Sequence, residues 1–159
     1  MSGLVENVLA LLGLGFVSAL VPLVNIEVIL AARAAAMATS GLWVLSLATA
    51  LGQMAGKVVW YYLGANALRW PWIARRVDTP KAQERLTRWR DRTQSRPVLA
   101  GALVFVSAFS GFPPFAILAV LAGQLRMSLT LFFVLGLAGR WLRFTAVLGG
   151  AEWLSGLLH

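Results

Sequence analysis

Five ionisable side chains lie within stretches of the sequence that are otherwise apolar: Glu27, Arg33, Lys57, Arg140 and Arg143. A charged side chain at the centre of a transmembrane helix costs roughly 2.5–3.5 kcal/mol on insertion scales, so each must be paired, hydrated or displaced towards the membrane surface. Four cations against one carboxylate leave an excess of three positive charges. This excess suggests that an anion binds among them, and the bidentate fork of arginine suits a phosphate group.

Arg140 and Arg143 are the strongest candidates, because their i, i+3 spacing in one apolar segment places both on one helical face. Each charge also has a structural interpretation. The arginines could pair with Glu27, Lys57 could reach the inner membrane surface, and Arg33 could lie near the outer surface. Glu27 could instead hold a cation or carry a proton. We expect Glu27 to lie near Arg140 or Arg143, since an isolated buried carboxylate would become protonated.

The composition excludes several kinds of site. The chain has no cysteine, and its single histidine is His159, so disulfides and thiolate metal sites are excluded and a histidine metal site is not expected. The sequence shows no nucleophile–base pair, phosphate-binding loop or nucleotide motif. We therefore expect no enzymatic activity, no cofactor and no metal.

The sequence is too apolar for a soluble domain. Hydrophobic residues make up 59% of the chain and charged residues only 13%, against about 25% charged in a typical soluble domain. Arg69–Arg96 holds nine basic and three acidic residues, which is +6 of the total net charge of +8. A single basic loop between apolar halves is the positive-inside pattern of a membrane protein. Nucleic acid is therefore not an expected partner.

Two segments, Leu42–Gly64 and Leu129–Gly150, are long and apolar enough to span a bilayer. The preceding stretches, Leu4–Ala38 and Val98–Met127, are interrupted and fall into pieces of mostly 12–17 residues. Such broken segments predict re-entrant hairpins, in which irregular backbone is buried in protein or lines a cavity. The predicted hairpin breaks are Pro22, Gly111, Pro113 and Pro114. Asn25 and Ser110 lie beside these breaks, where they could bind a ligand, although satisfying the freed backbone groups is the favoured role.

The two halves resemble each other. Phe16-Val-Ser-Ala19 matches Phe105-Val-Ser-Ala108, and Gly52-Gln-Met-Ala-Gly56-Lys57 is similar to Gly136-Leu-Ala-Gly139-Arg140. The glycines of the first motif predict close helix packing. We therefore predict an all-α polytopic membrane protein with an inverted repeat of two units. Each unit is a re-entrant helical hairpin followed by a transmembrane helix, and a basic amphipathic cytoplasmic loop joins them. The chain is predicted to form one membrane domain over residues 1–159, with repeats at about 4–64 and 98–150, the loop at 65–97 and a tail at 151–159.

Pro80–Ser95 in this loop is predicted to form an amphipathic helix, with Thr79 as its N-cap and Pro80 in the first turn. Ala82, Leu86 and Trp89 would share one face. The basic residues on another face are Lys81, Arg85, Arg88 and Arg92. This helix could lie on an anionic membrane surface or be a solvated charged helix, and the sequence does not separate the two.

These motifs resemble the DedA/VTT superfamily, and most closely its short bacterial YqaA-like branch, over about residues 12–150. The motifs that carry the resemblance are Pro22-Leu-Val-Asn-Ile-Glu27-Val-Ile-Leu, the glycine-rich helix Gly52–Gly64, Phe112-Pro-Pro-Phe, Ala122-Gly-Gln-Leu-Arg-Met127 and Gly139-Arg-Trp-Leu-Arg143-Phe. The resemblance implies two opposed re-entrant hairpins in the bacterial cytoplasmic membrane. It also implies phospholipid scrambling or flipping, or the recycling of a polyprenyl phosphate.

Two stretches depart from that family pattern. Ala108–Phe115 carries no charge where many members have arginines, and Gly15–Val21 lacks a second acid. Arg140 and Arg143 are then expected to take over headgroup binding, while proton coupling and polyprenyl phosphate lose support. The resulting hypothesis is a lipid transporter or scramblase with an anionic headgroup site between the hairpins. The alternatives are a carrier or channel for a small anion or drug, and a non-transporting membrane scaffold. The expected partners are lipids with anionic phosphate headgroups, and the glycine-rich helices permit a homo-oligomer.

The charge distribution predicts the orientation in the membrane. We expect Arg69–Arg96 to be cytoplasmic and both termini to lie outside, because cytoplasmic loops are enriched in basic residues. Single cysteines introduced into the loop and the tails of this cysteine-free chain should be labelled from opposite sides by an impermeant maleimide. Labelling of a tail cysteine only from the cytoplasmic side would contradict the inverted-hairpin arrangement.

Overall fold

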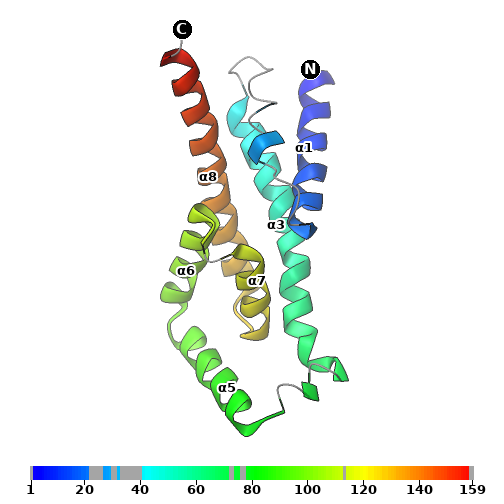
Figure 1. The fold of residues 1–159 in the computed structure, drawn as a ribbon, viewed down its shortest axis with the longest axis vertical. Helices are drawn as coiled ribbons and strands as arrows, with labels where there is room; N and C mark the ends of the chain where they lie inside the picture. Colours follow the sequence, from blue (N-terminus) through cyan, green and yellow to red (C-terminus); the bar gives the residue numbers. More distant parts are fainter. Residues whose placement is uncertain are drawn as a thin grey trace. The chain divides into compact units, whose positions relative to one another are not determined.

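The structure is a computed structural model that describes residues 2–21, 27–29, 32, 41–71, 74–75, 78–112 and 114–157. Within these residues the regular structure is entirely helical, which confirms the predicted all-α class (Figure 1). The helices are α1 (Ser2–Leu20), α3 (Leu42–Asn66), the short 3₁₀ helix η1 (Ala67–Arg69), α5 (Pro80–Ser95), α6 (Pro97–Ser110), α7 (Phe115–Gln124) and α8 (Leu129–Leu157).

Two of the described helices are long and apolar enough to cross a membrane, through Gly3–Leu20 in α1 and Leu129–Gly150 in α8. The second is one of the predicted spans. The other predicted span, Leu42–Gly64, lies within the continuous 25-residue helix α3, but Gln53 and Lys57 lower the hydropathy of its middle. The 19 residues of α1 exceed the 12–17 expected from the sequence, because nothing before Pro22 interrupts the helix.

The predicted break in the second half lies between α6 and α7, which have 14 and 10 residues. Gly111 ends α6 in a left-handed conformation with φ 79°, and its N–H donates to the carbonyl of Ser107 at 2.9 Å. The Ser110 hydroxyl donates to the Val106 carbonyl and accepts from the N–H of Phe112. Ser110 therefore satisfies local backbone groups, which is the structural role that the sequence favoured. Pro114 precedes α7, whereas Pro22 and Pro113 lie outside the described residues.

The chain divides into two compact units, one formed by residues 1–56 with 137–159 and the other by residues 57–136. The predicted single domain and inverted repeat stay predictions. In the first unit, α1 runs beside the first part of α3 (Figure 1). A Cβ on Gly52 would overlap the backbone of Leu12, and one on Gly56 would lie 2.5 Å from the Cβ of Ala19. The prediction of close packing at these two glycines is confirmed.

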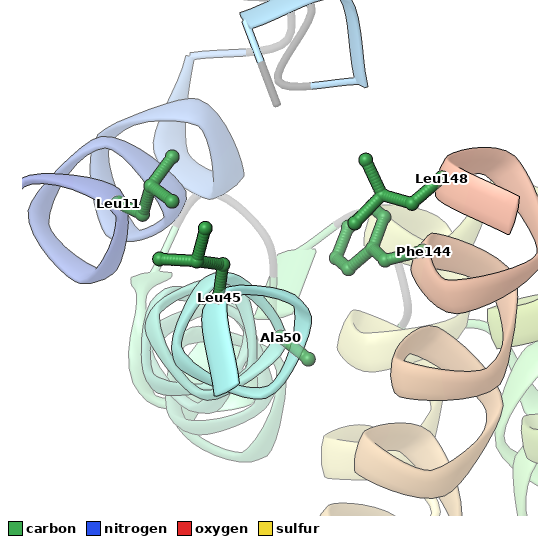
Figure 2. Close-up of a cluster of buried hydrophobic side chains, with 5 residues drawn as sticks. All are labelled: Leu11, Leu45, Ala50, Phe144 and Leu148. Carbon is green, nitrogen blue, oxygen red and sulfur yellow. The ribbon is translucent and has the colours of Figure 1, made fainter. Parts of the chain in front are cut away.

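The core of the first unit is an apolar cluster contributed by three helices (Figure 2). Leu11 of α1, Leu45 and Ala50 of α3, and Phe144 and Leu148 of α8 are each at most 1% exposed. Partly buried side chains surround them, namely Val8, Leu14 and Leu137. This packing fixes the face that α8 presents within the unit.

In the second unit, α7 packs against the end of α3. A Cβ on Gly64 would overlap the backbone of Val120, and one on Gly123 would overlap that of Tyr61. The Tyr61 hydroxyl donates to the Met127 carbonyl at 2.5 Å. Phe115 stacks on Phe132 with ring centroids 5.5 Å apart. This unit is therefore held by backbone contact at glycines and by aromatic packing.

Large apolar side chains remain exposed on several helices. They include Leu9 (63% exposed) on α1, Val98 (85%) and Leu99 (65%) on α6, and Leu142 (51%) on α8. Many large apolar side chains are thus exposed along the helices of this chain. Faces of this kind are typical of helices that contact lipid.

Two neighbouring glycines of α1 provide a matched test of the packing. We expect Gly15→Ala to destabilise the protein by about 1–3 kcal/mol, because its Cβ would lie 2.6 Å from the backbone oxygen of Thr49. Gly13→Ala should be neutral or stabilising by about 0.5–1 kcal/mol, since nothing lies within 4 Å of that position. Thermal unfolding in detergent should separate the variants, and equal midpoints would contradict the close contact of α1 with α3.

Candidate functional site

The structure brings Glu27 and Arg143 into an ion pair within the first unit. Residues 27–29 are helical, and Arg143 lies on α8. The Nε and Nη2 atoms of Arg143 each lie 2.6 Å from Oε1 of Glu27. The two side chains are only 27% and 33% exposed. The prediction that Glu27 lies near one of the two arginines is therefore confirmed.

Arg140 lies one turn earlier on α8 and is hydrogen-bonded to α3. Its Nη1 donates to Oε1 of Gln53, and its Nε atom is buried. Gln53 itself is 6% exposed. A neutral amide oxygen stabilises the guanidinium without neutralising it.

The hydrogen bonds continue from Gln53 to α1. Its Nε2 donates to the Ser18 hydroxyl at 3.0 Å, and that hydroxyl donates to the Gly15 carbonyl at 2.8 Å. Because an amide has one accepting and one donating end, its oxygen faces Arg140 and its nitrogen faces Ser18. This chain of bonds holds one end of the Arg140 guanidinium in place from two other helices.

Gln53 and Ser18 were not among the residues predicted for the site. Gln53 lies between the two glycines of the Gly52–Gly56 motif, in the middle of a long apolar segment. A polar side chain at that depth usually faces another helix or a cavity, so its position was the available signal. The sequence around Ser18 offered no such signal, because a buried serine in a helix more often forms a hydrogen bond with the backbone of its own helix.

Not all of the remaining predicted residues lie in the described part of the first unit. Lys57 is 7% exposed on α3 and belongs to the second unit, as do Ser110 and Gly111. Asn25 and Arg33 lie outside the described residues, as do two of the predicted break residues. The cluster within the first unit therefore consists of Glu27, Gln53, Ser18, Arg140 and Arg143.

The basic residues of α5 form a separate surface. Thr79 caps this helix and Pro80 occupies its first turn, as predicted. Lys81, Arg85, Arg88 and Arg92 are exposed. Trp89, expected to share a face with Ala82 and Leu86, is 57% exposed, whereas those two residues are half-buried.

The chemistry available to the cluster follows from its charges. Arg140, Arg143 and Glu27 carry two positive charges and one negative, which leaves a net charge of +1 on these three side chains. Guanidinium groups cannot be deprotonated in proteins and present planar sets of donors that match carboxylate or phosphate. No group of three metal-ligating side chains occurs among the residues that the structure describes. The cluster is suited to binding an anion.

Over the described residues the structure is helical, with exposed apolar faces and charged side chains within its long helices, which is typical of a helical membrane protein. A family model supports this class, since the VTT domain matches residues 21–151. The chain belongs to the VTT-domain family, within the DedA/VTT superfamily, whose members are membrane proteins often linked to transport. The match includes Glu27, Gln53, Arg140 and Arg143 but not Ser18. No curated protein and no solved structure matches the chain.

A double-mutant cycle can measure the Glu27–Arg143 pair. We expect Glu27→Gln and Arg143→Gln to show a coupling energy of about 1–3 kcal/mol in detergent unfolding, because both groups are largely removed from solvent. The matched control is the pair Glu84–Arg88 on α5, whose side chains are 69% and 63% exposed. Its coupling should be only about 0.3–0.5 kcal/mol. Equal coupling energies for both pairs would contradict a structurally important, partly buried Glu27–Arg143 interaction.

Proposed function

We propose that this protein transports or scrambles a lipid with an anionic phosphate headgroup across the bacterial cytoplasmic membrane. The phospholipids and polyprenyl phosphates are both of this class. The proposal includes a multi-pass arrangement with the basic loop on the cytoplasmic side and no enzymatic activity. Membership of a membrane family often linked to transport supports it.

The observation that carries the proposal is the composition of the Arg140–Arg143–Glu27 cluster. Two guanidinium groups share one helical face beside the carboxylate of Glu27, which lies 2.6 Å from Nη2 of Arg143. Arg140 is held by the amide of Gln53. Because an amide carries no charge, this hydrogen bond leaves the three ionic side chains of the cluster with a net charge of +1. This net positive charge and the guanidinium donors support the binding of an anionic headgroup.

The proposed binding step is an exchange of partners. In the absence of lipid, Glu27 holds Arg143 in a fixed orientation. An incoming phosphate would accept hydrogen bonds from Arg140 and Arg143, and its oxygens would compete with the Glu27 carboxylate for Arg143. Glu27 would re-form the pair as the lipid leaves, which limits the cost of exposing an unpaired cation to an apolar environment.

A non-transporting scaffold is the second candidate, favoured by one specific observation. Both arginines have partners within the protein, through Glu27 and Gln53. In this alternative the cluster serves only to join α8 to neighbouring helices.

Transport of a fluorescent phospholipid in proteoliposomes should distinguish these functions. Arg140→Gln should slow transport by about tenfold or more, because a hydrogen bond to a charged group contributes about 1.5–3 kcal/mol. Arg140→Lys should recover only part of the rate, since an ammonium cannot form the bidentate fork. Gln53→Glu should also slow transport while preserving stability, because a carboxylate there would neutralise Arg140.

Arg88→Gln is the matched control, since Arg88 lies on exposed α5 and should leave the rate nearly unchanged. The scaffold hypothesis predicts no lipid movement with any variant, together with a loss of stability in Arg140→Gln. Wild-type transport by Arg140→Gln would refute the binding site. A wild-type protein that moves no lipid would refute the proposed function itself.

A further inference from the structure

The two sides of α5 have different surroundings in the second unit. Ala82, Leu86, Arg90 and Thr93 are half-buried, at spacings that follow one face of the helix. Nη2 of Arg90 donates to the carbonyl of Gln124 at 3.2 Å, at the end of α7. One face of α5 is therefore packed against the unit, and the rest of the helix surface is exposed.

The exposed surface of α5 includes a basic stripe. Counting all of Pro80–Ser95, five basic residues and two acidic ones give a net charge of +3. The exposed stripe consists of Lys81, Arg85, Arg88 and Arg92. Only one ion pair involves this stripe among the described residues, between Arg88 and Glu84. The stripe thus keeps most of its positive charge.

Trp89 lies at the edge of the stripe. It is 57% exposed, and the guanidinium of Arg92 lies 5.7 Å from its ring centroid. The ring of an exposed tryptophan presents a large apolar surface to water, and contact between apolar surface and water is unfavourable. Tryptophan is enriched at membrane–water interfaces, where its ring lies at the level of the headgroups.

The position of α5 along the chain points to the same surroundings. Only Arg96 separates it from α6, which begins at Pro97. The first residues of α6 are apolar and exposed, with Val98 at 85% and Leu99 at 65%. A helix that needs lipid around its first turn therefore follows α5 directly, which brings the end of α5 to a membrane surface.

We propose that the outward face of α5 is a binding surface for anionic lipid headgroups, with Trp89 as its interfacial anchor. Lys81, Arg85, Arg88 and Arg92 attract the negative surface, as juxtamembrane basic segments do. The packing of Arg90 against α7 keeps this face turned outward. This surface is distinct from the Arg140–Arg143–Glu27 cluster and does not depend on lipid transport.

The test uses the full-length protein in lipid nanodiscs. The chain has no native cysteine, so Ser95→Cys, on the side of the basic stripe, can carry a single NBD fluorophore. We expect its emission to shift to the blue when phosphatidylcholine discs are replaced by discs containing phosphatidylglycerol. The shift should disappear at about 1 M salt, where the Debye length falls to about 3 Å. It should also be lost when all four stripe residues are changed to Gln.

Three controls make the result specific. The same label at Gln94→Cys, on the polar side of α5, should respond much less. Glu84→Gln, which raises the net charge of the helix, should strengthen the shift, whereas Trp89→Ala should weaken it. Circular dichroism of each variant checks that it remains folded. An emission that is the same in both lipids, or that is unchanged by the four Gln substitutions, would overturn the proposal.

Discussion

The arrangement of the first unit depends on the cost of holding two guanidinium groups among apolar helices. A buried charge without a partner is destabilising by several kcal/mol, so the sequence must supply partners at the right depth. Glu27 supplies a carboxylate to Arg143, and Gln53 supplies an amide oxygen to Arg140. These bonds tie α8 to α3 and to residues 27–29. The same interactions that stabilise the unit therefore also define the face that we propose binds an anion.

Close backbone contact makes this cluster possible. Gly52 and Gly56 let α1 approach α3 so closely that Gln53, lying between them, reaches the Ser18 hydroxyl at 3.0 Å. Side chains at either glycine would separate the helices and break that bond. The hydrogen bonds run from Ser18 through Gln53 to Arg140. Packing at two glycines therefore controls the orientation of a guanidinium group on a third helix. The apolar cluster around Phe144 holds α8 in the matching rotation.

The basic residues of the chain fall into two environments with different physical consequences. Arg140 and Arg143 lie among apolar helices, where each hydrogen bond is strong and a change of partner is costly. Lys81, Arg85, Arg88 and Arg92 lie on an exposed helix, where salt screens their charge and each contributes little to stability. The first group suits selective binding of one headgroup, and the second suits weak, additive attraction to a charged surface. The net charge of +8 therefore includes two groups of basic residues for which we propose different functions.

The sequence by itself determined the features that depend on local pattern. Composition established the helical membrane class, the cap and first-turn proline placed α5 within Pro80–Ser95, and the Gly52–Gly56 spacing predicted close packing. Arg140 and Arg143 were predicted as the possible partners of Glu27 because the inferred repeat places the first break against the second half, and because an isolated buried carboxylate would become protonated. Sequence patterns could not show that Gln53 would bind Arg140, that Ser18 would hold Gln53, or that Trp89 would stay exposed. Those outcomes depend on the rotation of each helix about its axis, which is set by contacts between residues far apart in the sequence, and only the tertiary structure decides them.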